Sequence, residues 1–289
     1  MRTVHKLRRL LVGAALAGAA ALSNSQATSN TGAVHLAQQQ ITAYLDQLAD
    51  LHCNETVTQQ KLSLEGNRVL ATEKADFDYL IMMNGNADDF QLNESRVEPA
   101  NARHRLVSNS MLVTNGMATV LLVFHPYYRD SFEFETREAE MINGSPAIPI
   151  HFTHISGRRT PAALALRGRE FPLELEGTAW LDESSGQVVR VETGLQSDLS
   201  EIGLSSLKMR VEYKPVKLPD HSKPMYLPAM AVVDVSTPRQ RWRNTHVFSG
   251  YRGFSTDTEQ DPNVKILPDK KANVEPPPVS PSQGDRTTP

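Results

Sequence analysis

The chain has 289 residues, of which 39% are hydrophobic and 22% charged, and its formal net charge is −3. Without residues 1–27 and 256–289, whose composition differs from that of the rest, about 230 residues remain. That length is enough for one hydrophobic core. The acidic balance argues against nucleic acid as the main partner. The single Cys53 excludes an internal disulfide, so the apolar core alone must stabilise the domain. We interpret Cys53 as a small buried hydrophobe, with a nucleophile or an intermolecular bridge as the alternatives.

The first 27 residues have the pattern of a secretory signal peptide. Four basic residues precede the apolar run "LLVGAALAGAAAL", and small residues follow up to Ala27. The apolar run is shorter than the roughly 20 residues of a membrane span. We therefore expect residues 1–27 to be removed, residues 28–33 to form a short leader, and the mature chain to be exported to the periplasm or the medium without an integral membrane span. Arg8 and Arg9 leave the twin-arginine route open. The mature chain has 26 basic and 33 acidic residues, a charge of −7.

The other end, "PDKKANVEPPPVSPSQGDRTTP", is polar, lacks aromatic residues and is rich in proline. This composition predicts a disordered tail over residues 256–289. A proline-rich ligand for a partner is the alternative. Between the two ends we expect one domain, residues 34–255.

An amphipathic helix is predicted at the start of the domain. Apolar residues recur there at intervals of three and four: Val34, Ala37, Ile41, Tyr44, Leu45, Leu48 and Leu51. The intervening positions carry glutamines and an aspartate, so one side of the helix faces an apolar surface and the other faces water.

After the helix the hydrophobic period changes to two, which predicts antiparallel strands. The expected strands are 56–64, 69–82, 90–97, 132–136, 148–152, a hairpin from about 171 to 194, 207–213, 227–236 and 240–254. Turn formers such as Asn143-Gly144 separate them. Residues 111–124 fit either a buried strand or a helix ended by Pro126, and we favour the helix. The fold class is therefore α+β.

The motifs after residue 176 resemble those of a known family. These are "GTAWLDESSGQVVRVE", "MRVEYKPV", "LPAMAVVDV" and "HVFSGYRGF". With the N-terminal helix and the run of strands, they resemble the LolA/LolB-like superfamily of periplasmic lipoprotein-sorting proteins over about residues 40 to 255, closest to a subgroup of uncharacterised exported bacterial proteins. The resemblance implies a strongly curved, incomplete β-barrel whose concave apolar face is covered by helices and holds acyl chains. The segment "HFTHISGRRTPAALALRGREF", the tail and the lack of a lipobox depart from any functional motif of the family.

Two apparent catalytic or metal patterns are coincidental. His151 and His154 lie three apart in an expected strand, so they point to opposite faces and do not share a metal. Ser205 and Lys208 match a Ser-x-x-Lys pattern, but that chemistry needs a helix and two partner motifs that this sequence lacks.

The sequence also lacks Gly-x-Ser-x-Gly, His-Glu-x-x-His and a phosphate-binding glycine-rich loop. Asp182 and Glu183 form an acidic pair that we assign to turn capping rather than to acid-base catalysis. We therefore expect a protein that is not an enzyme and binds no metal and no cofactor.

The candidate binding residues come from the two tryptophans, the helix and an arginine row. On a strand, Arg239, Arg241 and Arg243 share one face and Trp242 the other. The arginines suit an anionic group such as a lipid headgroup, or they guard a solvated edge strand. Trp242 and Trp180, with Leu48 of the helix, are assigned to the concave apolar side as ligand contacts.

Two functions remain from these patterns. One is a non-catalytic binding protein that holds a lipid or acyl chain in the concavity of the sheet. The other is an envelope protein-protein interaction or assembly module whose core is filled by its own helices. A large apolar cavity favours the first, and a closed core with an exposed apolar patch favours the second.

Overall fold

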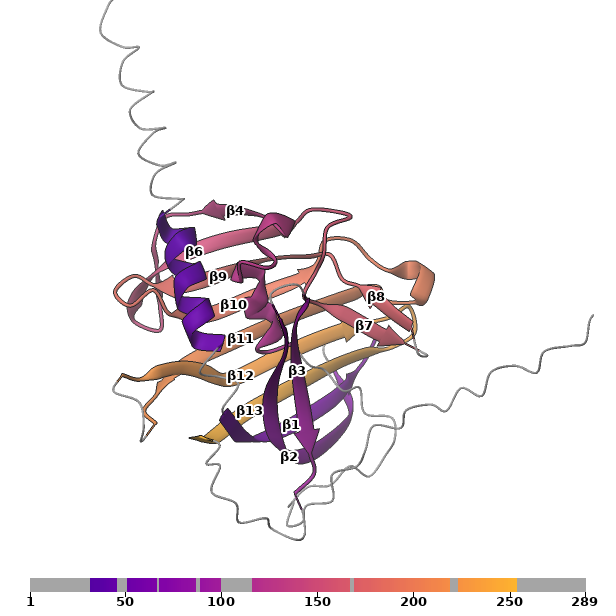
Figure 1. The fold of residues 1–289 in the computed structure, drawn as a ribbon. Helices are drawn as coiled ribbons and strands as arrows, with labels where there is room; N and C mark the ends of the chain where they lie inside the picture. Colours follow the sequence, from indigo (N-terminus) through magenta and orange to yellow (C-terminus); the bar gives the residue numbers. More distant parts are fainter. Residues whose placement is uncertain are drawn as a thin grey trace, which may run out of the picture.

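The computed structural model describes residues 32–45, 51–66, 68–86, 89–99, 116–166, 169–218 and 223–253. One N-terminal helix, residues 32–45, is followed in these ranges by strands and short 3-10 helices (Figure 1). The elements are β1 (Leu51–Leu62), β2 (Val69–Asn86), β3 (Asp89–Val97), η1 (Thr119–Phe124), η2 (Arg129–Ser131), β4 (Phe132–Thr136), β5 (Glu140–Ile142), β6 (Ser145–His154), β7 (Ala163–Leu166), β8 (Arg169–Pro172), β9 (Leu175–Asp182), β10 (Val188–Leu195), η3 (Ser200–Ile202), β11 (Ser206–Val216), β12 (Met225–Ser236) and β13 (Arg241–Gly253).

Eleven of the strands form one antiparallel sheet. Its order is β3-β2-β1-β13-β12-β11-β10-β9-β6-β4, with β5 beside β6, while β7 and β8 form a separate hairpin. Strands that follow one another in the chain are mostly neighbours in the sheet. The pairing of β1 with β13 is an exception, because it joins the first and last of the described strands along 11 residue pairs, and only β2 and β3 lie beyond β1 in the sheet.

The sheet has a covered inner face and an exposed outer face. Alternation is clear in β1, where Leu51, Cys53, Glu55, Val57 and Gln59 are all buried and the residues between them are not. Figure 1 shows the N-terminal helix lying in front of strands β6 to β11 on the inner face. The buried residues of the helix and of η1 belong to one cluster with the inner face: Ala37, Ile41, Tyr44, Leu45, Val120, Leu121, Leu122, Val123 and Phe124.

Most predicted elements are confirmed. The helix has the predicted buried stripe, although Leu51 belongs to β1 and residues 46–50 lie outside the described ranges. Each predicted strand overlaps an observed one, and the sequence missed β5, β7 and β8. Asn143 and Gly144 both have positive φ, 53° and 89°, as the two central residues of the tight β5–β6 turn require. The predicted signal peptide and tail lie outside the described residues.

Two parts of the predicted architecture are wrong. The sheet is open, since its end strands β3 and β4 do not pair, and it is not strongly curled, so the strongly curved half-barrel of the prediction does not form. The N-terminal helix and η1 cover the apolar inner face. The second helix is only the six-residue 3-10 helix η1, five of whose residues are buried. Such a segment has no polar face to present to water, so it lacks the amphipathic pattern of a longer surface helix.

Candidate functional site

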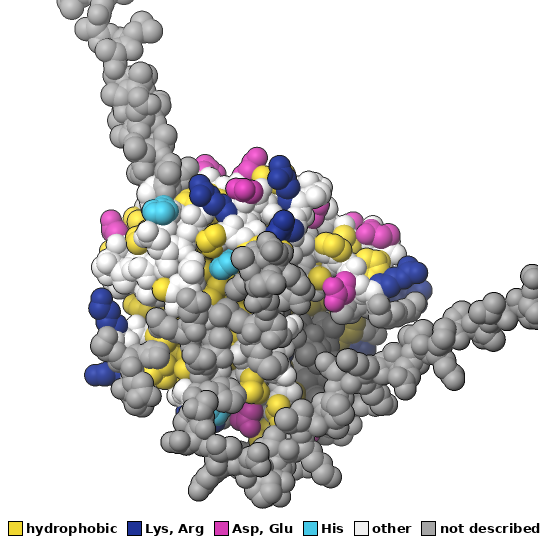
Figure 2. Space-filling view, viewed as in Figure 1, with side chains coloured by type: hydrophobic (Ala, Val, Ile, Leu, Met, Phe, Trp, Pro, Cys, Tyr) yellow, Lys and Arg dark blue, Asp and Glu magenta, His cyan; other side chains and the backbone are white. Residues whose placement is uncertain are grey.

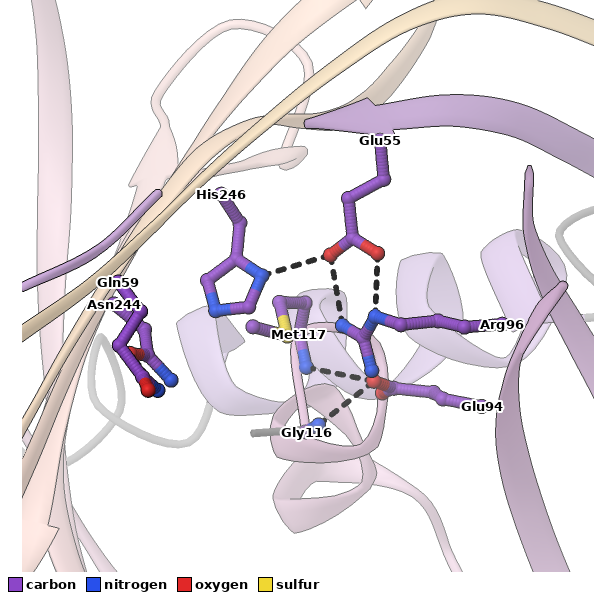
Figure 3. A network of polar contacts seen from close by, with 8 residues as sticks. All are labelled: Glu55, Gln59, Glu94, Arg96, Gly116, Met117, Asn244 and His246. Atoms are coloured by element: carbon purple, nitrogen blue, oxygen red, sulfur yellow. Dashed lines mark hydrogen bonds and ion pairs between the residues drawn. The ribbon is translucent and has the colours of Figure 1, made fainter. Parts of the chain in front are cut away.

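A buried charged cluster lies on the inner face where β1, β3 and β13 approach one another (Figure 3). Glu55 accepts two hydrogen bonds from the guanidinium of Arg96, through Nε to Oε2 and through Nη2 to Oε1, the latter at 2.7 Å. His246 Nδ1 lies 2.8 Å from Glu55 Oε1. The side chains of Arg96, Glu55 and His246 are 8%, 0% and 1% exposed. We call these three residues the charged cluster.

In the charged cluster, burial and ion pairing shift the pKa values in opposite directions. Burial alone raises the pKa of a carboxyl group, but the hydrogen bonds from His246 and Arg96 outweigh it and lower the pKa of Glu55. For Arg96, burial works to lower the pKa, and the hydrogen bonds and charge of Glu55 raise it. The cluster is therefore an ion pair at neutral pH, shielded from water and satisfied by its own members.

Glu94 connects β3 to η1 beside this cluster. Its carboxylate accepts hydrogen bonds from the backbone N–H groups of Gly116, Met117, Ala118 and Thr119, with distances of 2.7 to 3.3 Å. Thr119 Oγ1 also donates to it, at 3.1 Å. The first N–H groups of a helix have no partner within it, so the carboxylate stabilises the start of η1. Two residues apart on β3, Glu94 and Arg96 share the inner face.

The polar run continues along the sheet. Gln59 Nε2 donates to Asn244 Oδ1 at 2.8 Å, and both side chains are buried. The arrangement offers fixed hydrogen bonds but no nucleophile paired with a base. No group of three or more His, Cys, Asp or Glu residues that suits a metal occurs in the described part of the chain. These hydrogen bonds join β1, β3, β13 and η1.

Sequence reasoning missed the charged cluster. Glu55, Arg96 and His246 are far apart in sequence, and only the sheet brings them together. One signal was available: Glu55 occupies an inward position between Cys53 and Val57, where an apolar residue is normal. A charged residue at such a position indicates a buried partner.

Trp180 lies on the outer face, not on the inner one. Its neighbours Ala179 and Leu181 point inward and are buried, while Trp180 is half-buried. Its Nε1 donates to Glu140, and the Arg190 guanidinium lies 5.7 Å from the centre of its ring. The prediction that Trp180 faces the concave apolar side and its core is therefore wrong, because the strand turns the smaller residues on either side of it inward.

Trp242 and the arginines are placed as alternation requires, with one exception. Trp242 follows the inward parity of Asn244 and His246 and is half-buried, while Arg241 and Arg243 take the other face. Arg239 is exposed in the turn before β13, so it is not part of a row on the strand. Arg243 is paired with both oxygens of Asp234, at 2.8 and 3.1 Å, and Arg241 donates to the carbonyl of Gly66 at 2.8 Å. Leu48 lies outside the described residues.

Three further interpretations agree with the structure, and they concern the two histidines, Asp182 and Cys53. His154 is buried and His151 is half-exposed on the other face, so they do not converge. Asp182 Oδ1 accepts hydrogen bonds from the backbone and hydroxyl groups of Ser184 and Ser185, at 2.6 to 3.1 Å. Although burial opposes it, these bonds lower the pKa of Asp182, as expected of a turn-capping carboxylate. Cys53 is fully buried, and burial raises its pKa to about 12.

An open hollow of about 830 Å³ on the described surface covers the outer face of β9 to β12 and is lined mainly by polar groups such as Thr178, Glu192 and Arg210. Figure 2, which views the helix side, shows acidic and basic side chains mixed along the upper edge, with no field of a single sign there. None of the described helices is both long enough and apolar enough to span a bilayer.

No protein-family model and no curated protein matches this sequence. Solved structures do show a likeness in fold. A DUF1329 family protein from Desulfovibrio piger is 11% identical, with a TM-score of 0.43, over 79% of this chain and 95% of that one. A putative outer membrane lipoprotein-sorting protein domain from Vibrio parahaemolyticus is also 11% identical, with a TM-score of 0.40, over 80% and 95%. A LolA superfamily protein from Nitrosomonas europaea is 10% identical, with a TM-score of 0.35, over 75% and 94%. Each of these likenesses is one of fold, at low sequence identity.

Proposed function

We propose that this is an exported, non-catalytic binding protein that holds an apolar ligand, such as a lipid or acyl chain, between the inner face of the sheet and the N-terminal helix. In this proposal the helix acts as a removable lid. When it leaves, it uncovers an apolar surface, and the ligand replaces the contacts that the helix had made.

The observation that carries the proposal is the way the helix is attached. Its buried side contributes Ala37, Ile41 and Leu45 to the core. On the same side, Gln38 Nε2 and Tyr44 Oη are buried without a hydrogen-bond partner among the described residues. A buried polar group left unpaired costs about 1 to 3 kcal/mol. An interface with two such groups is less stable than a permanent core contact of the same area, which suits a helix that must detach.

One hydrogen bond marks where the lid meets the sheet. Gln187 Nε2, just before β10, donates to Gln40 Oε1 at 3.1 Å. Because both glutamines are near the surface, cysteines at these two positions provide a reversible clamp. Cys53 does not interfere, since it is buried and its pKa is raised.

The test is acyl binding with the lid free and with the lid clamped. In Gln40→Cys/Gln187→Cys, a short bis-thiosulfonate reagent joins the two thiols, and reductant removes it. We expect delipidated protein to bind fatty acids in a calorimeter, with Kd improving up to about fourfold for each methylene until the site is full. The clamped protein should not bind, and reduction should restore binding.

The matched control is the same variant treated with a monofunctional thiosulfonate, which modifies both thiols without joining them. Equal binding by clamped and control protein would show that the helix is not a lid. Absence of heat at every chain length would exclude the carrier function.

The alternative function is an envelope protein-protein interaction module. It is favoured by the continuity of the described core, in which helix, η1 and sheet residues pack as one cluster. In that case the helix is a permanent part of the fold, and a folded monomer binds no fatty acid saturably.

A further inference from the structure

The end of the sheet formed by the β1–β2 hairpin is unusually apolar for a surface. Leu64, Val69 and Leu70 are 55%, 45% and 49% exposed, and they make up three of the six large hydrophobic residues exposed in the described ranges. Val69 and Leu70 are consecutive in β2, so they project from opposite faces of the hairpin. Apolar side chains therefore surround this end. We call residues 61–70 the hairpin tip.

Positive charge accompanies the apolar side chains. Lys61 and Arg68 of the hairpin tip are exposed, as is Arg239 in the adjacent turn. Arg241 pairs with Leu62 in the sheet and donates to the carbonyl of Gly66, so the turn and the hairpin tip lie together. Residues 61–70 and 237–241 contain four basic residues and one acidic residue, in a chain whose net charge is negative.

A hollow of about 190 Å³ opens beside the hairpin tip on the inner face. It is lined by Gln59, Lys61, Ala71, Glu73, Gln240 and Trp242. An indole next to a lysine at the boundary of an apolar surface is typical of groups that sit at the level of lipid headgroups.

These features point to a membrane rather than to a protein groove. A partner groove covers one face of a hairpin, but a lipid surface surrounds a tip whose two faces are both apolar. The ring of lysine and arginine side chains complements anionic headgroups. We propose that the hairpin tip docks the protein on an anionic lipid surface. This contact does not depend on a ligand beneath the helix, so the two proposals are tested separately.

The experiment is flotation of the full chain with vesicles of phosphatidylglycerol and phosphatidylcholine, compared with vesicles of phosphatidylcholine alone. We expect binding to the anionic vesicles that weakens with salt. Leu64→Ser/Leu70→Ser should weaken it by about tenfold or more, because apolar area no longer leaves water. Lys61→Gln/Arg68→Gln should weaken it by about fivefold for each charge removed.

Matched controls test whether vesicle binding depends on the hairpin tip or on any exposed apolar or basic residue. Met141→Ser removes a 66% exposed apolar residue elsewhere, and Lys208→Gln/Lys214→Gln removes two exposed charges on β11. All variants share the same termini, so any binding by the ends of the chain is common to them. The controls should bind as the wild type does. Failure of the wild type to bind anionic vesicles, or equal losses in tip and control variants, would overturn the proposal.

Quenching of tryptophan fluorescence shows which face of the protein contacts the membrane. In Trp180→Phe the only remaining tryptophan is Trp242, beside the hairpin tip. Vesicles with brominated acyl chains should quench its fluorescence, whereas the complementary variant Trp242→Phe, which retains Trp180 on the outer face, should remain unquenched. Quenching of Trp180 instead would place the membrane on the outer face and contradict the docking site.

Discussion

Removing the negative charge of Glu55 tests the energetic role of the charged cluster. In Glu55→Gln the side chain keeps its shape, but Arg96, whose side chain is 8% exposed, loses its counter-charge. Removal of one partner from a buried ion pair destabilises a protein by about 3 to 5 kcal/mol, since the other charge stays buried and unpaired. For a domain of this size, that corresponds to a fall in Tm of roughly 6 to 20 °C.

The sign of the pH dependence follows from the lowered pKa of Glu55. A carboxyl group whose pKa is lower in the folded state stabilises the fold above its ordinary pKa of 4.5, and that contribution is lost as pH falls through the folded value. We therefore expect the stability difference between wild type and Glu55→Gln to be constant near neutrality and to shrink below about pH 4.5. Urea unfolding at a series of pH values measures it.

An exposed ion pair is the matched control. Arg210 Nε and Glu192 Oε1 are also 2.8 Å apart, but their side chains are 52% and 38% exposed. Glu192→Gln should change the free energy of unfolding by no more than about 1 kcal/mol. If Glu55→Gln costs as little as Glu192→Gln, or if its cost does not diminish in acid, our account of the charged cluster is wrong.

Three further predictions concern packing and reactivity. Gly177→Ala should destabilise the protein by about 1 to 3 kcal/mol, because a Cβ there would collide with the carbonyl of Glu192 and lie 2.7 Å from Phe152 Cζ. At Gly253 a Cβ would meet nothing within 4 Å, so Gly253→Ala should be nearly neutral. Thermal unfolding compares the two variants. Leu181→Ala should cost about 2 to 5 kcal/mol, and Trp180→Ala distinctly less since it lies on the outer face; a larger loss for Trp180 would return it to the core. Cys53 should react slowly with a maleimide at pH 8 in the folded protein and rapidly in urea, because burial raises its pKa to about 12; equal rates would disprove its burial.

The elements of this fold were readable from local patterns. Alternation located the main strands, the spacing of Ala37, Ile41 and Tyr44 located the helix, and Asn143-Gly144 located a tight turn. These features depend on neighbours within a few residues, so periodicity and turn chemistry determine them.

The features that the patterns missed depend on distant partners. The curvature of a sheet depends on the twist and pairing of all its strands, which local patterns do not specify. Trp180 adjoins Leu181 in sequence, and hydrophobicity alone does not decide which of two consecutive apolar residues points inward. The charged cluster needed the pairing of β1 with β13, of β1 with β2 and of β2 with β3, which only the whole sheet specifies.

The pairing of β1 with β13 also determines when the molecule folds. Its contacts join residues nearly the whole domain apart: Gln59 with Asn244, 185 positions away, and Glu55 with His246, 191 positions away. The chain must lose the conformational entropy of closing so long a loop before these contacts can stabilise the fold, and this slows folding. Until β13 is synthesised, β1 and β12 each present an open edge where their common neighbour belongs. The junction that joins the β1–β3 part of the sheet to the strands from β12 onward therefore forms last, and a nascent chain cannot reach its native state before β13 is made.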